Sequence, residues 1–282
     1  MEKYHSALEK IMKEGTDKKT RNGITRSLFA IQIRFNMSDG FPAITTKKLA
    51  WKAVVSELLW FIEGSGDERR LAEILHKTRD KDKKTIWSAN SKANYWLDRG
   101  YSKFDGDLGR IYGVQWRHWK NQFGEEIDQL KDIIERIKSD PNDRRLIVSA
   151  WNPGELKYMA LPPCHMSFQF YIADNNISLH MNQRSADMFL GVPFNIASYS
   201  LLLHMVGQVT GYNAYEVVLT FNDAHIYKEH FESVEELLKR TPNKSPQLKL
   251  NPKISSIDNF KMEDIELIDY NPQESISAKM IV

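Results

Sequence analysis

The sequence predicts an α+β protein in which helices pack on a mixed β-sheet and surround one long buried helix. Two runs, 165–173 and 177–184, roughly alternate apolar and polar residues, as half-buried strands do. The Asp-Asn-Asn sequence at 174–176 is typical of a hairpin turn between them. A helix expected at 194–208 is apolar on most faces, which favours burial. Because no repeat, low-complexity block or linker interrupts the chain, we expect residues 1–282 to form a single domain.

Hydrophobic periodicity and turn residues place the remaining elements. The first half is expected to contain an amphipathic helix at 2–15, a solvated basic turn at 17–23, a strand at 27–35, a polar connection at 41–48, a largely buried helix at 51–62, and a helix followed by a charged loop over 67–84. The second half is expected to add an amphipathic helix at 127–139, strands at 146–151 and 215–220, a polar turn at 222–227, a helix at 227–239, and short strands over 251–270.

Composition excludes several classes of protein. The chain of 282 residues is 41% hydrophobic, has a net charge of +2 and contains one cysteine. A single cysteine allows no internal disulfide, and neither a signal-peptide core nor a bilayer-length apolar run is present, so we expect a cytoplasmic protein without membrane association. The small net charge and the lack of a basic stripe with interleaved aromatic residues argue against nucleic-acid binding.

Candidate chemistry is concentrated between residues 161 and 199. Cys164 is a possible nucleophile, and a nearby Arg184 could stabilise its thiolate. His165 is poorly placed to act as a base for Cys164, because adjacent strand residues point to opposite faces. The histidines show no metal-ligand spacing, so no metal site is expected.

Two further charged features have open interpretations. Glu57 lies on a very apolar helix, where a carboxylate is costly unless it forms a salt bridge or serves a function. The sequence favours these two interpretations equally. The pair Arg144 and Arg145 is typical of a surface, unless an anion or a partner subunit meets it.

An ordered set of motifs resembles the thymidylate synthase family from near the start of the chain to its end. The set comprises RNG at 21–23, TTK at 45–47, ELLW at 57–60, YGVQWR at 112–117, DRR at 143–145, LPPCH at 161–165, FQFY at 168–171, QRSAD at 183–187, LGVPFNIASY at 190–199 and DAHIY at 223–227. The resemblance implies a homodimeric methyltransferase, with a sheet face used for dimerisation. It implies transfer of a one-carbon unit from the co-substrate 5,10-methylenetetrahydrofolate to C5 of dUMP.

The resemblance also implies the roles of particular residues. The catalytic set would be Cys164, Glu57, Tyr112, Asn195 and Arg184. The nucleotide would be bound by Arg21, Gln183, Ser185, Asp187, Asn195, His225 and Tyr227, with Arg144 and Arg145 completing the phosphate site of the other subunit. The folate would be flanked by Trp87, Asn90, Leu161, Asp187, Leu190, Gly191, Phe194 and Ile281, under an apolar tail formed by residues 280–282.

Four positions depart from the common pattern of this family. They are Ser88 in place of an aspartate, Arg110 in place of a proline, Asn182 in place of a tyrosine and Asn222 in place of a glycine. Extra polar groups near the pocket could admit water, and a water that captured the methylene intermediate would give 5-hydroxymethyl-dUMP. The expected product is therefore dTMP, with dUMP hydroxymethylation as the alternative reaction.

Overall fold

A computed structural model describes residues 1–281, and it is built on a six-stranded mixed sheet. The strands are β1 (Thr16–Thr20), β2 (Gly23–Asn36), β5 (Ile147–Ser149), β6 (His165–Ala173), β7 (Asn176–Asp187) and β8 (Asn213–Tyr227). Their spatial order is β1-β2-β8-β7-β6-β5, and only β7 and β8 run parallel. The predicted α+β class is confirmed.

The hairpin between β6 and β7 forms at the predicted turn. Asp174 and Asn175 have φ angles of 49° and 62°, in the left-handed region that Asp and Asn tolerate well. Because β7 and β8 are parallel, the chain must cross over the sheet between them. Helix α8 (Gly191–Thr210) makes that connection.

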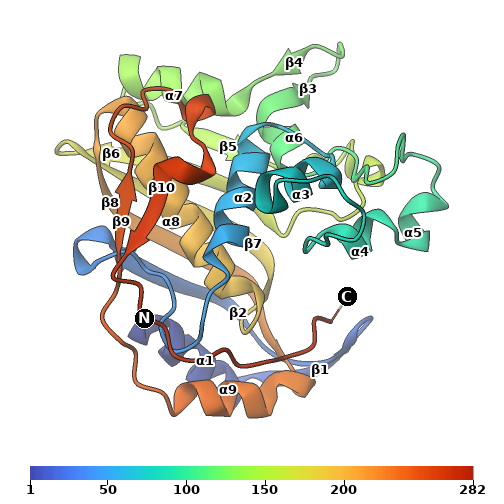
Figure 1. Cartoon of the computed structure of the whole chain (residues 1–282), viewed down its shortest axis with the longest axis vertical. Helices are drawn as coiled ribbons and strands as arrows, with labels where there is room; N and C mark the ends of the chain where they lie inside the picture. Colours follow the sequence, from blue (N-terminus) through green and yellow to red (C-terminus); the bar gives the residue numbers. More distant parts are fainter. Residues whose placement is uncertain (282) are drawn as a thin grey trace.

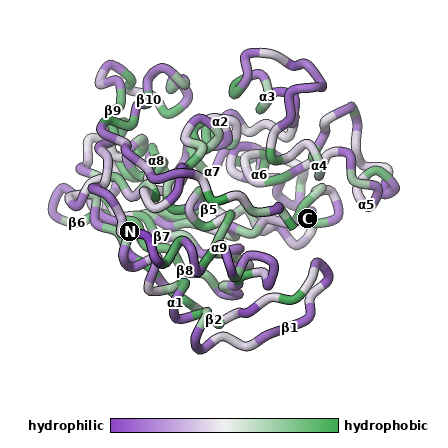
Figure 2. The backbone as a smooth tube through the Cα atoms, turned by 60° about the horizontal axis from the view of Figure 1, so that its bottom comes forward, coloured by the Kyte–Doolittle hydropathy of each residue, from purple (hydrophilic) through white to green (hydrophobic). Residues whose placement is uncertain are grey.

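Helix α8 is the long buried helix that the sequence predicts. Most of its side chains are buried, and hydrophobic segments gather around it in Figure 2. It begins at Gly191 rather than at 194, because Pro193 fits the first turn, where no helical N–H partner is needed. Gly211 ends it with a φ of 83°, a left-handed conformation that glycine adopts without strain.

The other helices cover the sheet and one another (Figure 1). They are α1 (Glu2–Glu14), α2 (Trp51–Ile62), α3 (Glu68–His76), α4 (Ser88–Ser91), α5 (Asn94–Leu97), α6 (Tyr112–His118), α7 (Gln129–Ser139) and α9 (Phe231–Leu238). Short 3-10 turns lie at Met37–Asp39, Leu156–Tyr158, Lys228–His230, Ile257–Asn259 and Met262–Asp264. Two small ribbons pair β3 (Trp119–Lys120) with β4 (Glu126–Ile127) and β9 (Gln247–Leu250) with β10 (Ile265–Ile268). Within the described residues, no helix combines the length and the apolar character needed to cross a membrane.

Two local predictions were wrong. Residues 222–227 are not a turn but the end of β8, because this segment pairs with β2 on one side and, as far as His225, with β7 on the other. The basic turn at 17–23 is largely a β-hairpin, since β1 pairs with β2 and only Arg21 and Asn22 form the turn. The predicted connection at 41–48 is present, without helix or strand, and it is mostly buried. The C-terminal part of the chain supplies hydrogen-bond partners: the Thr45 hydroxyl donates to the carbonyl of Asn243, and the Thr45 carbonyl accepts from the N–H of Gln273.

Candidate active site

The candidate nucleophile lies where β6 begins beside the end of β7. The backbone N–H of Arg184 donates to the carbonyl of Cys164 at 2.9 Å. The Arg184 guanidinium donates to the carbonyls of Pro163 and Pro162, and one of its nitrogens lies 4.0 Å from the Cys164 Sγ. Burial raises the pKa of the thiol, and the charge of Arg184 opposes that rise. The structure thus brings the predicted thiol and arginine together.

Tyr112 holds the backbone on the other side of Cys164. Its hydroxyl accepts a hydrogen bond of 2.7 Å from the Cys164 N–H. Tyr112 is buried and has a φ of 23°, a strained value for a bulky residue of the kind that gathers at functional sites. The ring of His165 packs edge-on against Tyr112 and Tyr199, and among the described contacts it makes no hydrogen bond to Cys164.

Glu57 on α2 is the carboxylate of this region. Its Oε1 accepts a hydrogen bond of 2.7 Å from the indole N–H of Trp87. Burial raises the pKa of Glu57 to about 7, although the bond from Trp87 opposes the rise. No ion pair involving Glu57 occurs among the described residues, which contradicts the reading of a structural salt bridge. A carboxyl that exchanges its proton near neutral pH suits general acid–base chemistry.

A cavity of about 160 Å³ opens beside the β1–β2 hairpin. It is lined by Thr20, Arg21, Asn22, Thr25, Ser185, Asp223, His225 and Tyr227. Four of these were predicted to bind the nucleotide: Arg21, Ser185, His225 and Tyr227. Thr20, Asn22, Thr25 and Asp223 were not assigned to the site. Thr20 and Thr25 lie outside every quoted motif, whereas Asn22 and Asp223 lie within the RNG and DAHIY motifs, which could have identified them. An exposed arginine with hydroxyl and imidazole groups around it can bind a phosphorylated sugar.

The floor of the site contains polar atoms without partners. Gln183 is buried and donates to the carbonyl of Ser185 at 2.9 Å, while its Oε1 has no partner. The Nδ1 of His165 is also buried and has no hydrogen-bond partner among the described residues, and burial lowers the pKa of this imidazole to about 4, although Asn195 opposes the fall. Since buried polar groups are nearly always hydrogen-bonded, these atoms are open to a polar ligand or an ordered water.

The start of α8 carries the residues predicted to flank a folate. Asp187 Oδ1 accepts from the N–H groups of Phe189 and Leu190, which fixes the loop leading to Gly191 and Phe194. Lys47, which sequence reasoning quoted only as part of a motif, is buried there and donates to the carbonyl of Phe189 at 2.6 Å. Burial lowers the pKa of Lys47 to about 8.

The remaining predicted folate residues come from separate segments. Trp87 is buried, Leu161 is partly buried just before Cys164, and the Asn90 amide donates to the hydroxyl of Tyr95 at 3.2 Å. The C-terminal end of the chain lies near α4, which follows Trp87 (Figures 1 and 2). Ile281 is partly buried, and Val282, the last residue of the predicted tail, lies outside the described residues.

Arg144 and Arg145 are not near the cavity residues of the same chain. They precede β5, the edge strand opposite β1 in the sheet, whereas Arg21 lies in the turn between β1 and β2. The side chain of Arg145 is 79% exposed and pairs with Asp143 at 2.8 Å.

The four departures from the family pattern do not line the cavity. Arg110 pairs with Glu155 at 2.7 Å, and Ser88 hydrogen-bonds to Glu68 at 2.6 Å. Asn182 on β7 and Asn222 on β8 are half-buried and are likewise absent from the lining of the cavity.

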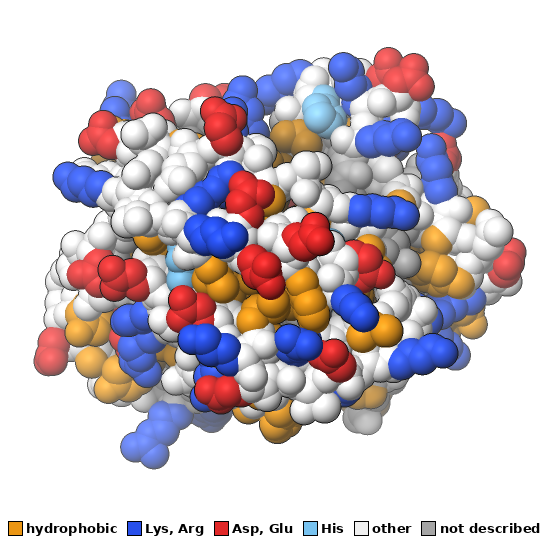
Figure 3. Space-filling model, turned by 90° about the horizontal axis from the view of Figure 1, so that it is seen from below, with side chains coloured by type: hydrophobic (Ala, Val, Ile, Leu, Met, Phe, Trp, Pro, Cys, Tyr) orange, Lys and Arg blue, Asp and Glu red, His pale blue; other side chains and the backbone are white. Residues whose placement is uncertain are grey.

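Two observations on the whole molecule complete the description of the site. Within the described residues, no group of three or more His, Cys, Asp or Glu side chains is arranged to hold a metal ion. On the face of the molecule seen in Figure 3, positive and negative side chains are intermingled.

Compared with known protein families, residues 2–282 match the family model described as thymidylate synthase.

Proposed function

Because the chain belongs to the thymidylate synthase family, whose enzymes transfer a one-carbon unit from methylenetetrahydrofolate to dUMP, we propose that it makes dTMP and dihydrofolate from these two substrates. The assembly of Cys164, Arg184, Tyr112 and Glu57 carries the proposal. These groups come from four separate segments, and they meet where a nucleophile and a proton-exchanging acid are both needed.

Cys164 is the nucleophile in this proposal. Its thiolate adds to C6 of the uracil ring, and the ring carbon C5 becomes nucleophilic. The Arg184 guanidinium, 4.0 Å from Sγ, stabilises the thiolate against the burial that raises the pKa of the thiol. A phosphate dianion brought beside Arg184 would compete for that charge, so nucleotide binding and thiol activation are linked.

Glu57 and Tyr112 manage the protons. A carboxyl with a pKa of about 7 can give a proton to O4 of the ring or, through an ordered water, accept one from C5. Tyr112 keeps its proton, because burial raises its pKa well above the ordinary value, and it fixes the Cys164 backbone.

The cavity beside the hairpin takes the sugar and phosphate. Arg21, Arg184 and Ser185 hold the 5′-phosphate, while His225 and Tyr227 bind the sugar 3′-hydroxyl. The Asn195 amide donates to O4 of uracil and accepts from N3–H, and the unpartnered Gln183 Oε1 supplies a further acceptor.

The residues at the start of α8 fit a folate stacked on the nucleotide. A bound folate supplies the one-carbon unit and the hydride. Asp187 binds the pterin, and Trp87, Asn90, Leu161, Leu190, Gly191 and Phe194 line its surroundings. The C-terminal residues, including Ile281, close over it and exclude water.

Arg144 and Arg145 act in the other subunit of a homodimer. Within one chain they lie at the sheet edge opposite the hairpin, so they can reach a phosphate only across an interface. Mixing an Arg144→Ala/Arg145→Ala variant with a Cys164→Ser variant should therefore restore part of the activity that each homodimer lacks. Absence of any recovery after verified subunit exchange would contradict the shared site.

Product analysis distinguishes dTMP from the alternative, 5-hydroxymethyl-dUMP. The buried Trp87 and the partly buried, apolar Ile281 support a dry site and hence hydride transfer. We expect a rise in near-ultraviolet absorbance from dihydrofolate, together with a nucleotide product of the mass of dTMP. A 5-hydroxymethyl-dUMP mass without dihydrofolate would replace the proposal with the alternative.

A further inference from the structure

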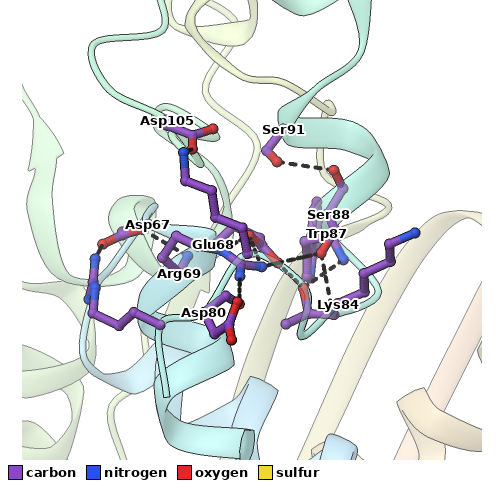
Figure 4. A network of polar contacts seen from close by, with 12 residues as sticks. Asp67, Glu68, Arg69, Asp80, Lys84, Trp87, Ser88, Ser91 and Asp105 are labelled. Carbon is purple, nitrogen blue, oxygen red and sulfur yellow. Dashed lines mark hydrogen bonds and ion pairs between the residues drawn. The ribbon is translucent and has the colours of Figure 1, made fainter.

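A buried ion pair lies behind the segment that carries Trp87 (Figure 4). Glu68 and Arg69, at the start of α3, are only 1% and 9% exposed. The Arg69 guanidinium donates to both carboxylate oxygens of Glu68, at 2.7 and 2.6 Å, and also to the carbonyl of Asp80 at 2.6 Å. Because a buried pair is a poor source of net stability compared with apolar residues, its presence needs another explanation.

The same carboxylate holds the residues on either side of Trp87. Glu68 Oε1 accepts hydrogen bonds of 2.6 Å from the hydroxyls of Thr85 and Ser88. The Thr85 hydroxyl in turn accepts from the backbone N–H of Trp87 at 3.1 Å, and the Ser88 hydroxyl accepts from the N–H of Thr85 at 2.8 Å. The turn that presents Trp87 is thus fixed from behind by one anion.

Trp87 connects the fixed turn to Glu57. Its indole N–H donates to Glu57 at 2.7 Å, and its ring packs against Trp60 and Tyr112. A single hydrogen bond depends on the placement of its donor, so a turn that loosened at Thr85 would weaken the bond to Glu57.

We propose that Glu68, Arg69, Thr85 and Ser88 are positioning residues that hold the Trp87 indole on the Glu57 carboxylate and so adjust the protonation of Glu57. The importance of this adjustment for turnover rests on the proposed function. The adjustment itself is a property of the free protein and can be measured without substrate.

Among the groups around Glu57, the Trp87 indole is the main partner whose hydrogen bond can change the pKa of Glu57. Tyr112 of α6 and Tyr199 of α8 face it, and burial raises the pKa of both, so they stay neutral. Cys164 lies beyond Tyr112, and its thiol pKa is also raised. Because the Trp87 bond stabilises the charged form of Glu57, loss of that bond moves the pKa of Glu57 upward.

The direct test is an infrared titration of the Glu57 carboxylic acid band, identified as the band that a Glu57→Gln variant lacks. Glu68→Gln removes the anion, and Thr85→Val removes only the hydroxyl that links Glu68 to Trp87, in case the first variant does not fold. We expect both to shift the midpoint upward by about one pH unit, the lower end of the range for loss of one hydrogen bond to a charged group. The matched control is Glu63→Gln, which breaks the exposed pair with Arg70 and should leave the midpoint unchanged.

Two double variants separate positioning from general loosening. Ser88→Asp places a carboxylate near Arg69, whose nitrogen lies 3.5 Å from the Ser88 hydroxyl, so Glu68→Gln/Ser88→Asp should return the midpoint toward wild type. In a Trp87→Phe background, which lacks the indole donor, Thr85→Val should cause no further shift. An unchanged midpoint in Thr85→Val, or an equal shift with and without the indole, would overturn the proposal.

Discussion

Glu57 and Glu68 are carboxylates on two helices that pack together, α2 and α3, yet the protein surrounds them in opposite ways. Glu68 is paired with Arg69 and accepts from two hydroxyls. Among the described residues, Glu57 receives one indole N–H and pairs with no cation, and burial raises its pKa to about 7. Burial alone therefore does not identify a catalytic acid. The number and charge of the donors around a buried carboxylate decide how strongly its charged form is stabilised.

The two environments also suit the carboxylates to different roles. A paired and saturated carboxylate can hold other residues in place, because its charge is compensated and its oxygens are occupied. An undersatisfied carboxylate costs folding energy but remains available to substrate. Substitution at Glu57 should therefore act mainly on activity, and substitution at the Glu68–Arg69 pair mainly on stability.

Replacement of the exchangeable carboxyl should have the largest effect. Glu57→Gln keeps the shape of the side chain and removes the ionisable group, so kcat should fall by about 10²- to 10⁴-fold, the range for loss of general acid–base catalysis. Steady-state assays at neutral pH give the value, and a dUMP binding measurement shows whether the nucleotide site is intact. Wild-type kcat in this variant would exclude Glu57 from the chemistry.

Breaking the Glu68–Arg69 pair should have the next largest effect. It should lower the stability of the fold and not the rate of the chemical step. Arg69→Met leaves Glu68 buried without its cation, so the free energy of unfolding should fall by about 3–5 kcal/mol. Denaturant unfolding provides the measurement. The neighbouring Arg70→Met is the matched control: Arg70 pairs with Glu63 and Glu73 at a half-exposed surface, and its loss should cost less than about 1 kcal/mol. Equal losses in the two variants would mean that burial of the Glu68–Arg69 pair has no energetic consequence.

The smallest effect concerns the dependence of stability on pH. Below pH 4.5, the ordinary pKa of a glutamate, Glu57 is protonated in the folded and the unfolded chain. Between pH 4.5 and about 7 the unfolded chain loses this proton while the folded chain keeps it, so stability falls as pH rises. Above about pH 7 the loss is complete, at about 3 kcal/mol or less.

Glu57→Gln removes this contribution, so its stability relative to wild type should increase from pH 4.5 to about 7 and then stay constant. Urea unfolding of both proteins across this pH range measures the difference. A constant difference throughout would show that the pKa of Glu57 is not raised.

Local patterns were enough to predict much of the fold. The hairpin of β6 and β7, the buried helices α2 and α8 and the amphipathic helices α1 and α7 each leave a periodicity or a turn signal within a short window. The clustering of Cys164, Gln183, Arg184 and Asp187 could also be predicted, because they lie in one segment of the sequence. Cys164 directly precedes β6, and the other three lie on the neighbouring β7. The motif set added the family, which the family match from residue 2 to 282 confirms.

Tertiary structure decided which groups meet. The segment 222–227 contains the polar residues of a turn, but pairing on both sides extends it as a strand. Thr45 and Lys47 are buried because the C-terminal segment and the start of α8 supply their hydrogen-bond partners. Glu57 could be recognised as a costly carboxylate from its helix, but its partner Trp87 lies 30 residues away in the chain. Periodicity records which residues are buried and not what they are buried against, so only the folded chain distinguishes the exchangeable Glu57 from the paired Glu68.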